Sequence, residues 1–151
     1  FGLCALIGCR LGARKTMRLR TVRSLRCDLQ LLRERIAASS DTLVELTAKQ
    51  NGLLFACIGT YLERIMQGES DAAAAAHAAK ELNVGETACA GVELFLTGLY
   101  TAARSDLLNR SQSLSATLER AENEAEAEAK QTRVLQISGV LAGAGLAILL
   151  W

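Results

Sequence analysis

Residues 107–128 read LLNRSQSLSATLERAENEAEAE, and this stretch decides the fold. Spacings that alternate between four and three put positions 107, 111, 114, 118, 121, 125 and 128 on one side of a helix. They hold Leu, Ser, Leu, Leu, Ala, Ala and Glu, so this seam becomes more polar toward its end. Ala and Glu also have high helix propensity. The pattern predicts one long helix that begins near Ser105, with its acidic run as a solvated face.

The chain continues without a helix breaker into residues 134–151, VLQISGVLAGAGLAILLW, which carry no charge. A helix of this length spans about 27 Å, close to the thickness of a hydrocarbon core. Gly139 and Gly143 form a GxxxG spacing that permits close helix approach in membranes, and Trp151 suits an interface. We therefore predict a C-terminal transmembrane helix over 134–151. The alternative is a buried hairpin helix of a soluble domain.

The opposite end of the chain is apolar and then strongly basic. Residues 1–9 are too few to span a bilayer, and the chain starts with Phe, so we expect the true N-terminus upstream of Phe1. Residues 1–15 are interpreted as the end of an incomplete transmembrane segment with a basic collar. Residues 6–9, LIGC, also resemble a lipoprotein cleavage box, which is the alternative. Seven of the 17 Lys and Arg residues make up the basic collar: Arg10, Arg14, Lys15, Arg18, Arg20, Arg23 and Arg26.

The basic collar sets the predicted orientation. Basic residues beside a membrane span tend to stay cytoplasmic, so residues 16–133 are predicted to form a cytoplasmic helical domain. An anionic membrane surface is the expected partner of the collar. The other interpretation is a nucleic-acid interface. Because no aromatic residues interleave with the collar and the rest of the chain is net acidic, we predict no nucleic-acid partner.

The domain between the two ends is predicted to be a small helical bundle. The chain contains no Pro and few aromatic residues, which suits helices packed through Leu, Ile, Val and Ala. Apolar residues recur on one face up to residue 36, which predicts a first helix that ends at Ala38. Capping and turn signals predict four more helices: one behind a Thr42–Glu45 capping box to Lys49, one ending near Gly68, one from Ser70 or Asp71 to Leu82, and one over 86–102. The predicted fold class is all-α, a small bundle with a long C-terminal helix that continues into the membrane.

The sequence contains no recognisable chemical centre. His77 is the only histidine, and its nearest cysteine, Cys89, falls in another predicted helix. Five cysteines without a CxxC pair predict reduced thiols rather than a disulfide framework. Phosphate-loop and Gly-x-Ser-x-Gly motifs do not occur. We therefore predict that the protein is not an enzyme and binds neither a cofactor nor a metal.

The order of the segments resembles the stage III sporulation protein AB family. Three passages carry the resemblance: the basic-to-leucine passage 20–36, the passage 86–99, and 118–150, where an acidic helix runs into SGVLAGAGLAILL. Two features depart from the family pattern. Thr42 stands where a turn proline is usual, and residues 100–103 replace a Gly-x-x-Asp feature.

The resemblance implies a body similar to the cytoplasmic domain of the type II secretion inner-membrane platform protein. It implies a non-enzymatic structural and coupling subunit of a secretion-like channel complex between mother cell and forespore, required for endospore formation. The expected location is the mother-cell membrane around the forespore. Expected partners are a cytoplasmic secretion-type ATPase and membrane subunits of the same complex, with a homo-oligomer as a further candidate. The alternatives are a membrane signalling adaptor that relays a signal through its long C-terminal helix, and a soluble DNA-binding protein.

Overall fold

The computed structural model describes the backbone of residues 2–38, 42–48 and 50–149, and the side chains of 14–38, 42–45, 47–48, 50–131 and 134. Within these ranges the fold is all-helical, as predicted from the sequence. The elements in chain order are α1 (Gly2–Ala38), α2 (Leu43–Ala48), α3 (Leu53–Met66), α4 (Asp71–Glu81), α5 (Glu86–Leu96), the 3-10 helix η1 (Leu99–Thr101) and α6 (Arg104–Leu149).

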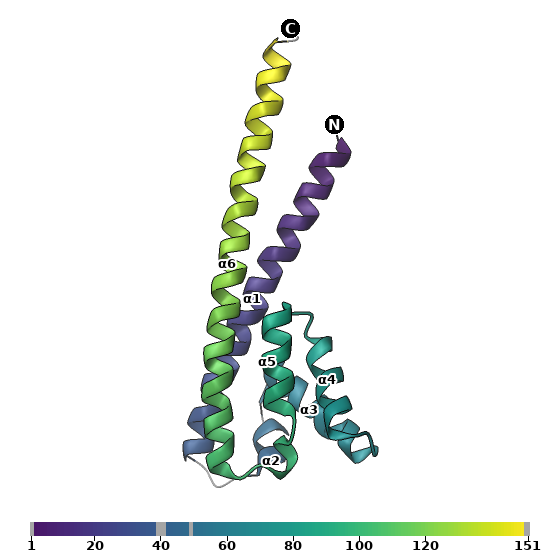
Figure 1. Cartoon of the computed structure of the whole chain (residues 1–151), viewed down its shortest axis with the longest axis vertical. Coiled ribbons are helices and arrows are strands. Elements are labelled where there is room, and N and C mark those ends of the chain that lie inside the picture. The colour runs from purple at the N-terminus through teal and green to yellow at the C-terminus, as the bar shows by residue number, and fades with distance from the viewer. Residues whose placement is uncertain (1, 39–41, 49, 150–151) are drawn as a thin grey trace.

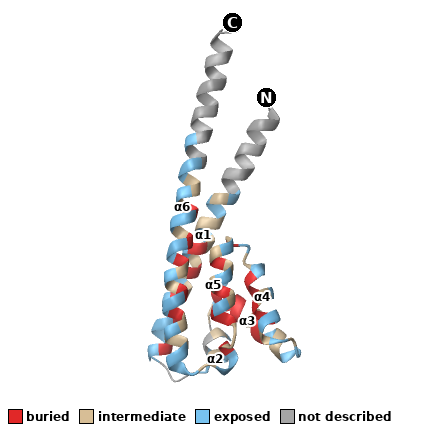
Figure 2. Cartoon of the chain, in the orientation of Figure 1, coloured by how far each residue is buried: buried red, intermediate tan, exposed pale blue. Residues whose placement is uncertain are grey.

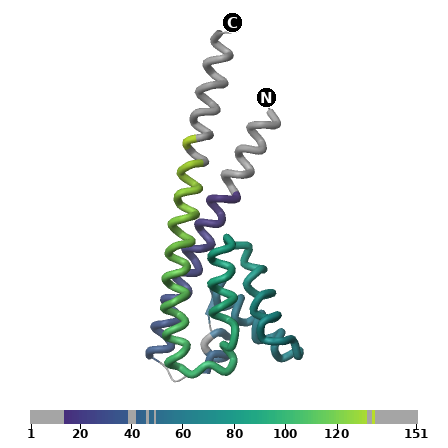
Figure 3. The backbone as a smooth tube through the Cα atoms, viewed as in Figure 1, coloured from purple at the N-terminus to yellow at the C-terminus, as the bar shows by residue number. Residues whose placement is uncertain are grey.

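Two long helices, α1 and α6, form the frame of the molecule. They run antiparallel and pack on one another, and their chain-terminal ends extend from the same end of the bundle (Figure 1). The short helices gather at the other end of the pair, on one side of it (Figure 3). α3 packs on α1, α5 packs on α6, and α4 lies against both α3 and α5. The body is therefore a compact bundle at one end of a long helix pair.

The predicted seam of α6 is confirmed. Leu114, Leu118, Ala121 and Ala125 are buried, and the hydroxyl of buried Ser111 donates a hydrogen bond to the carbonyl of Leu108 at 2.7 Å. The facing positions of α1 are also buried: Val22, Leu25, Leu29, Leu32 and Ile36. Figure 2 shows both buried stripes in the lower part of the helix pair. Matching apolar stripes with spacings of three and four explain why the two helices pair lengthwise.

The predicted helix boundaries around α2 and α3 are also confirmed. The backbone N–H of Thr42 donates to the Glu45 carboxylate at 2.9 Å, and the backbone N–H of Glu45 donates to the Thr42 hydroxyl at 3.4 Å. This is the capping box. After α3, Gly68 adopts a left-handed conformation with φ 88°, and the N–H of Glu69 bonds the Arg64 carbonyl at 3.0 Å. These contacts form the αL turn that ends a helix at glycine.

The prediction of one helix over 86–102 was wrong. α5 ends at Leu96, and Gly98 adopts φ 72° before the chain enters η1. The backbone N–H of Gly98 donates to the Asp71 carboxylate at 2.7 Å. The Arg110 guanidinium donates to the Thr97 carbonyl. These two contacts stabilise a turn that separates α5 from η1.

The predicted transmembrane segments fall almost entirely on residues outside the described set. Side chains of residues 1–13 and 135–151 are not described, although the backbone of α6 is helical to Leu149. Among the described residues, no helix is both long enough and apolar enough to cross a bilayer. The described residues therefore do not support the predicted transmembrane continuation of α6.

Candidate functional site

The candidate site is the end of the α1–α6 seam nearest the chain termini, where charged pairs replace apolar contacts. On α1, Lys15 and Arg18 stand seven residues before Val22 and Leu25, so they continue the same helix face. Lys15 Nζ and Arg18 Nη1 lie 3.9 and 3.7 Å from the same carboxylate oxygen of Glu128. Glu128 is the last position of the seam that was predicted on α6. The seam thus ends in a layer of opposite charges.

About two turns closer to the bundle, two arginines of α1 hold one glutamate of α6. Arg23 Nε donates to Glu122 Oε1 at 2.8 Å, and Arg26 Nη1 donates to Glu122 Oε2. The Glu122 side chain is only 15% exposed. The hydrogen bonds from Arg23 and Arg26 hold the pKa of Glu122 below its usual range. We call these three residues the Arg–Glu clasp.

Arg18 also reaches a third helix. A Cβ atom on Gly85, the residue before α5, would lie 3.2 Å from the guanidinium carbon of Arg18. The guanidinium group therefore lies against the α4–α5 turn while it faces Glu128 of α6. On the same level, the Thr87 hydroxyl of α5 donates to Glu124 of α6 at 2.9 Å. Polar contacts thus link α1, α5 and α6 where the long helices leave the bundle.

The structure divides the predicted basic collar into two groups. Four members contact the acidic stretch of α6: Lys15, Arg18, Arg23 and Arg26. Arg14 and Arg20 are exposed and form no ion pair with any residue whose side chain is described. The side chain of Arg10 lies outside the described residues. The collar as predicted is therefore partly an intramolecular surface.

The prediction that the acidic run is a solvated face needs correction. Glu122 and Glu128 accept contacts from α1, and Glu124 accepts one from α5. The reason is the antiparallel register, which brings the acidic end of α6 beside the basic end of α1. The sequence contained a partial signal, because basic residues precede the apolar stripe of α1 and Glu128 follows that of α6.

The other end of the helix pair is held by Arg104, which sequence reasoning missed. Its Nη2 donates to the carbonyl of Ile36 and, at 3.0 Å, to that of Ala37. These carbonyls belong to the last turn of α1, which lacks partners within its own helix. A cation there is also favoured by the helix dipole. Arg104 at the start of α6 thus fixes the end of α1.

Asp28 is a second residue whose role the sequence did not predict. Its Oδ2 accepts a hydrogen bond from the backbone N–H of Leu54 at 3.0 Å, which caps the first turn of α3. A Cβ on Gly52 would lie 2.6 Å from the same carboxylate oxygen. Gly52 is therefore required because Asp28 approaches the backbone closely. This contact sets α3 against α1.

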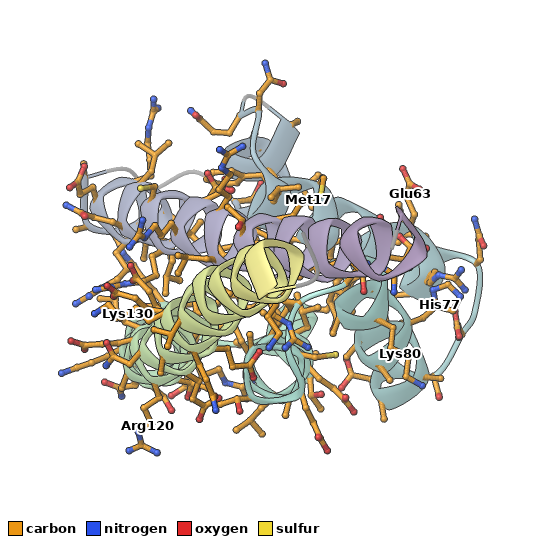
Figure 4. All side chains as sticks on the ribbon, turned by 90° about the horizontal axis from the view of Figure 1, so that it is seen from above. Met17, Glu63, His77, Lys80, Arg120 and Lys130 are labelled. Carbon is orange, nitrogen blue, oxygen red and sulfur yellow. The ribbon has the colours of Figure 1, made fainter. Side chains whose placement is uncertain are left out.

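The described residues offer no evident chemical centre. No group of three His, Cys, Asp or Glu side chains among them could hold a metal ion. His77 on α4 contacts Arg64 at 3.0 Å and Glu81 at 3.4 Å, on the opposite side of the molecule from Arg120 and Lys130 of α6 (Figure 4). The Cys57 thiol is buried, and burial raises its pKa to about 12. A thiol with this pKa is a poor nucleophile at neutral pH.

The fold and the charged seam together define a small helical protein built on an antiparallel pair of long terminal helices. The chain belongs to the stage III sporulation protein AB family, whose model matches residues 1–151, the whole chain. The resemblance noted from the sequence is thereby confirmed, and the family implies a role in sporulation. Neither the curated proteins nor the solved structures gave a match.

Proposed function

We propose that the protein is a non-enzymatic, membrane-anchored structural and coupling subunit of a secretion-like complex between mother cell and forespore. The observation that carries this proposal is the antiparallel pairing of α1 and α6 (Figure 1). Both terminal sequences of the chain are apolar, and the pairing directs them to the same end of the bundle. A protein with this arrangement can attach to one membrane through both ends.

The register of the pair supports this reading. Lys15 of α1 lies opposite Glu128 of α6. Five positions farther along each helix lie Arg10 and Arg133, the last charged residues before the two apolar ends. Two apolar sequences that begin equally far along the chain from one ion pair suit a single bilayer surface, with the body of residues 16–133 on the cytoplasmic side.

The stiffness of the helix pair supports a coupling role. α6 runs without a break from Arg104 to Leu149. Arg104 holds it to α1 at one end of the seam, and the ion pairs of Glu128 hold it at the other. Such a pair transmits the position of the bundle to the membrane-proximal ends. The partners would be a cytoplasmic secretion-type ATPase, membrane subunits of the same complex and the anionic membrane surface. A signalling adaptor that uses the same unbroken α6 is the second candidate.

The test uses the tagged full chain in sporulating cells. We expect it to resist carbonate extraction, to be protected from protease added outside whole cells, and to co-purify with a secretion-type ATPase. The double variant Arg14→Ser, Arg20→Ser changes only exposed collar residues that make no ion pair with described residues. It should weaken or reorient membrane attachment without unfolding the bundle.

Arg35→Ser is the matched control, because Arg35 is also exposed but lies at the far end of α1. It should behave as the wild-type chain. Release of the wild-type chain by carbonate, or cleavage of its body from outside the cell, would refute membrane anchoring. If the collar double variant attached to the membrane as the wild-type chain does, Arg14 and Arg20 would have no role in attachment.

A further inference from the structure

The α1–α6 pair has two flanks, and within the described part of the chain the other helices cover one of them. On the covered flank, Asp28 of α1 contacts α3, and Thr117 of α6 lies against Gly91 of α5. The other flank carries a groove of about 710 Å³ between the two long helices. Leu29 and Leu108 lie among its lining residues. The open flank thus offers a recess along the helix pair.

The lining residues recur with helical periods on both walls. On α6 they are Leu108, Ser115 and Glu122, which are spaced by seven residues. On α1 they include Arg23 and Ala37, four turns apart, with Gln30 midway between them. Fourteen residues of helix correspond to about 21 Å. A groove of this length between two helices matches the recess into which a third helix packs.

Positive charge exceeds negative charge in this groove. Arg23 and Arg26 share the single carboxylate of Glu122. Arg33 also lines the groove, is exposed, and forms no ion pair with any described residue. Against these stands Glu34, which accepts a hydrogen bond from Gln30 at 3.2 Å. An occupant with acidic side chains would therefore complement the groove.

We propose that this groove binds an amphipathic helix of a protein partner, with acidic residues flanking its apolar face. The apolar face lies between the two long helices, and an acidic residue pairs with Arg33. The inference gives the proposed coupling subunit a partner-binding face, and it rests on the proposed function only in taking that partner to be another subunit of the complex.

The binding test uses the purified full chain in nonionic detergent and two synthetic peptides of about three heptads. Both have Leu on one face; one has Glu at the flanking positions and the other has Lys. We expect fluorescence anisotropy to show the Glu peptide binding at least about tenfold more tightly than the Lys peptide. Arg33→Glu should weaken binding of the Glu peptide about tenfold. Arg35→Glu, on the same helix outside the groove, should leave it unchanged.

Cys27 provides a readout of location without any substitution. It is exposed and lines the groove, so the bound Glu peptide should slow its alkylation, as followed by mass spectrometry of cysteine-containing fragments. The alkylation rate of Cys89, on α5, should not change. Protection of Cys27 together with the Arg33 effect would establish the groove as the binding site.

Equal binding of the two peptides, equal effects of Arg33→Glu and Arg35→Glu, or an unprotected Cys27 would each overturn the proposal. Heparin binding as tightly as the Glu peptide would overturn it as well, since the groove would then be a general anion site. A dimer that Arg33→Glu dissociates would assign the groove to a second copy of the chain instead. None of these outcomes changes the expected result of carbonate extraction. Failure of the groove proposal can therefore be distinguished from failure of membrane anchoring.

Discussion

Substitution of alanine for either of two helical glycines, Gly91 or Gly59, tests how closely the helices of the bundle pack. Gly91 lies within α5, and a Cβ there would lie 2.6 Å from Cγ2 and 3.2 Å from Cβ of Thr117 on α6. Gly59 lies within α3, and a Cβ there would meet nothing within 4 Å. Both Gly→Ala changes gain helix propensity of about 1 kcal/mol. Any difference between the two variants therefore reports the contact with Thr117.

The expected loss of stability in Gly91→Ala follows from the restricted rotamers of Thr117. A β-branched side chain has few rotamers in a helix, and the Thr117 hydroxyl is already bonded to the Ser113 carbonyl at 3.1 Å. Overpacking of this kind costs about 1–3 kcal/mol. Gly91→Ala should therefore be destabilised by up to about 2 kcal/mol, and Gly59→Ala stabilised by roughly 0.5–1 kcal/mol. For a chain of this size, each kcal/mol corresponds to about 2–4 °C in Tm.

The assay is thermal unfolding of the full chain followed by far-ultraviolet circular dichroism. Adding Thr117→Ser to Gly91→Ala removes the clashing methyl group and keeps the hydroxyl, so the double variant should recover most of the lost stability. If Gly91→Ala were as stable as Gly59→Ala, or if Thr117→Ser gave no recovery, the close approach of α5 and α6 would be refuted.

Asp28→Ala should cost about 1 kcal/mol, because the N–H of Leu54 loses its cap; Asp28→Asn, which keeps an acceptor, should cost less, and equal losses would argue against the cap. The hydrogen bonds from Arg23 and Arg26 hold the folded-state pKa of Glu122 below its ordinary value, so its stabilising contribution is present above that ordinary value and is lost as pH falls through the folded pKa. Glu122→Gln should therefore be less stable than wild type at pH 7, with a flatter acid limb of the stability curve, and parallel acid limbs would contradict the clasp. Cys57, whose pKa is raised to about 12 by burial, should react with iodoacetamide at neutral pH at least about tenfold more slowly than exposed Cys27; equal rates would show that Cys57 is accessible.

The parts of the fold that depend on local pattern could be predicted from the sequence. The stripes of α1 and α6 were visible as spacings of three and four, and the capping box at Thr42 and the glycine turn at Gly68 mark helix ends within a few residues. Each of these features is set by side chains less than two helical turns apart. None of these features depends on contacts between segments that are far apart in the sequence.

The parts that were missed depend on contacts between distant residues. The helix predicted over 86–102 is interrupted at Gly98, whose N–H donates a hydrogen bond to the carboxylate of Asp71, 27 residues away in the chain. The apolar periodicity through Leu99 obscured that turn. The Arg–Glu clasp joins residues 96 and 99 positions apart, so no local pattern could reveal it. Only the antiparallel register of the seam brings the two charged stretches together.

The pairing changes how the basic collar should be understood. The seam between α1 and α6 loses apolar area toward the chain termini, from leucines to Ala121 and Ala125 and then to the Glu128 layer. Contacts held by exposed charges weaken with salt, whereas the leucine part of the seam does not depend on it. The collar therefore has two separable roles. Four of its members hold α1 to α6, and the exposed Arg14 and Arg20 remain for an anionic surface. Substitution of the whole collar would confuse loss of attachment with loosening of the helix pair, whereas substitution of these two residues alone would not.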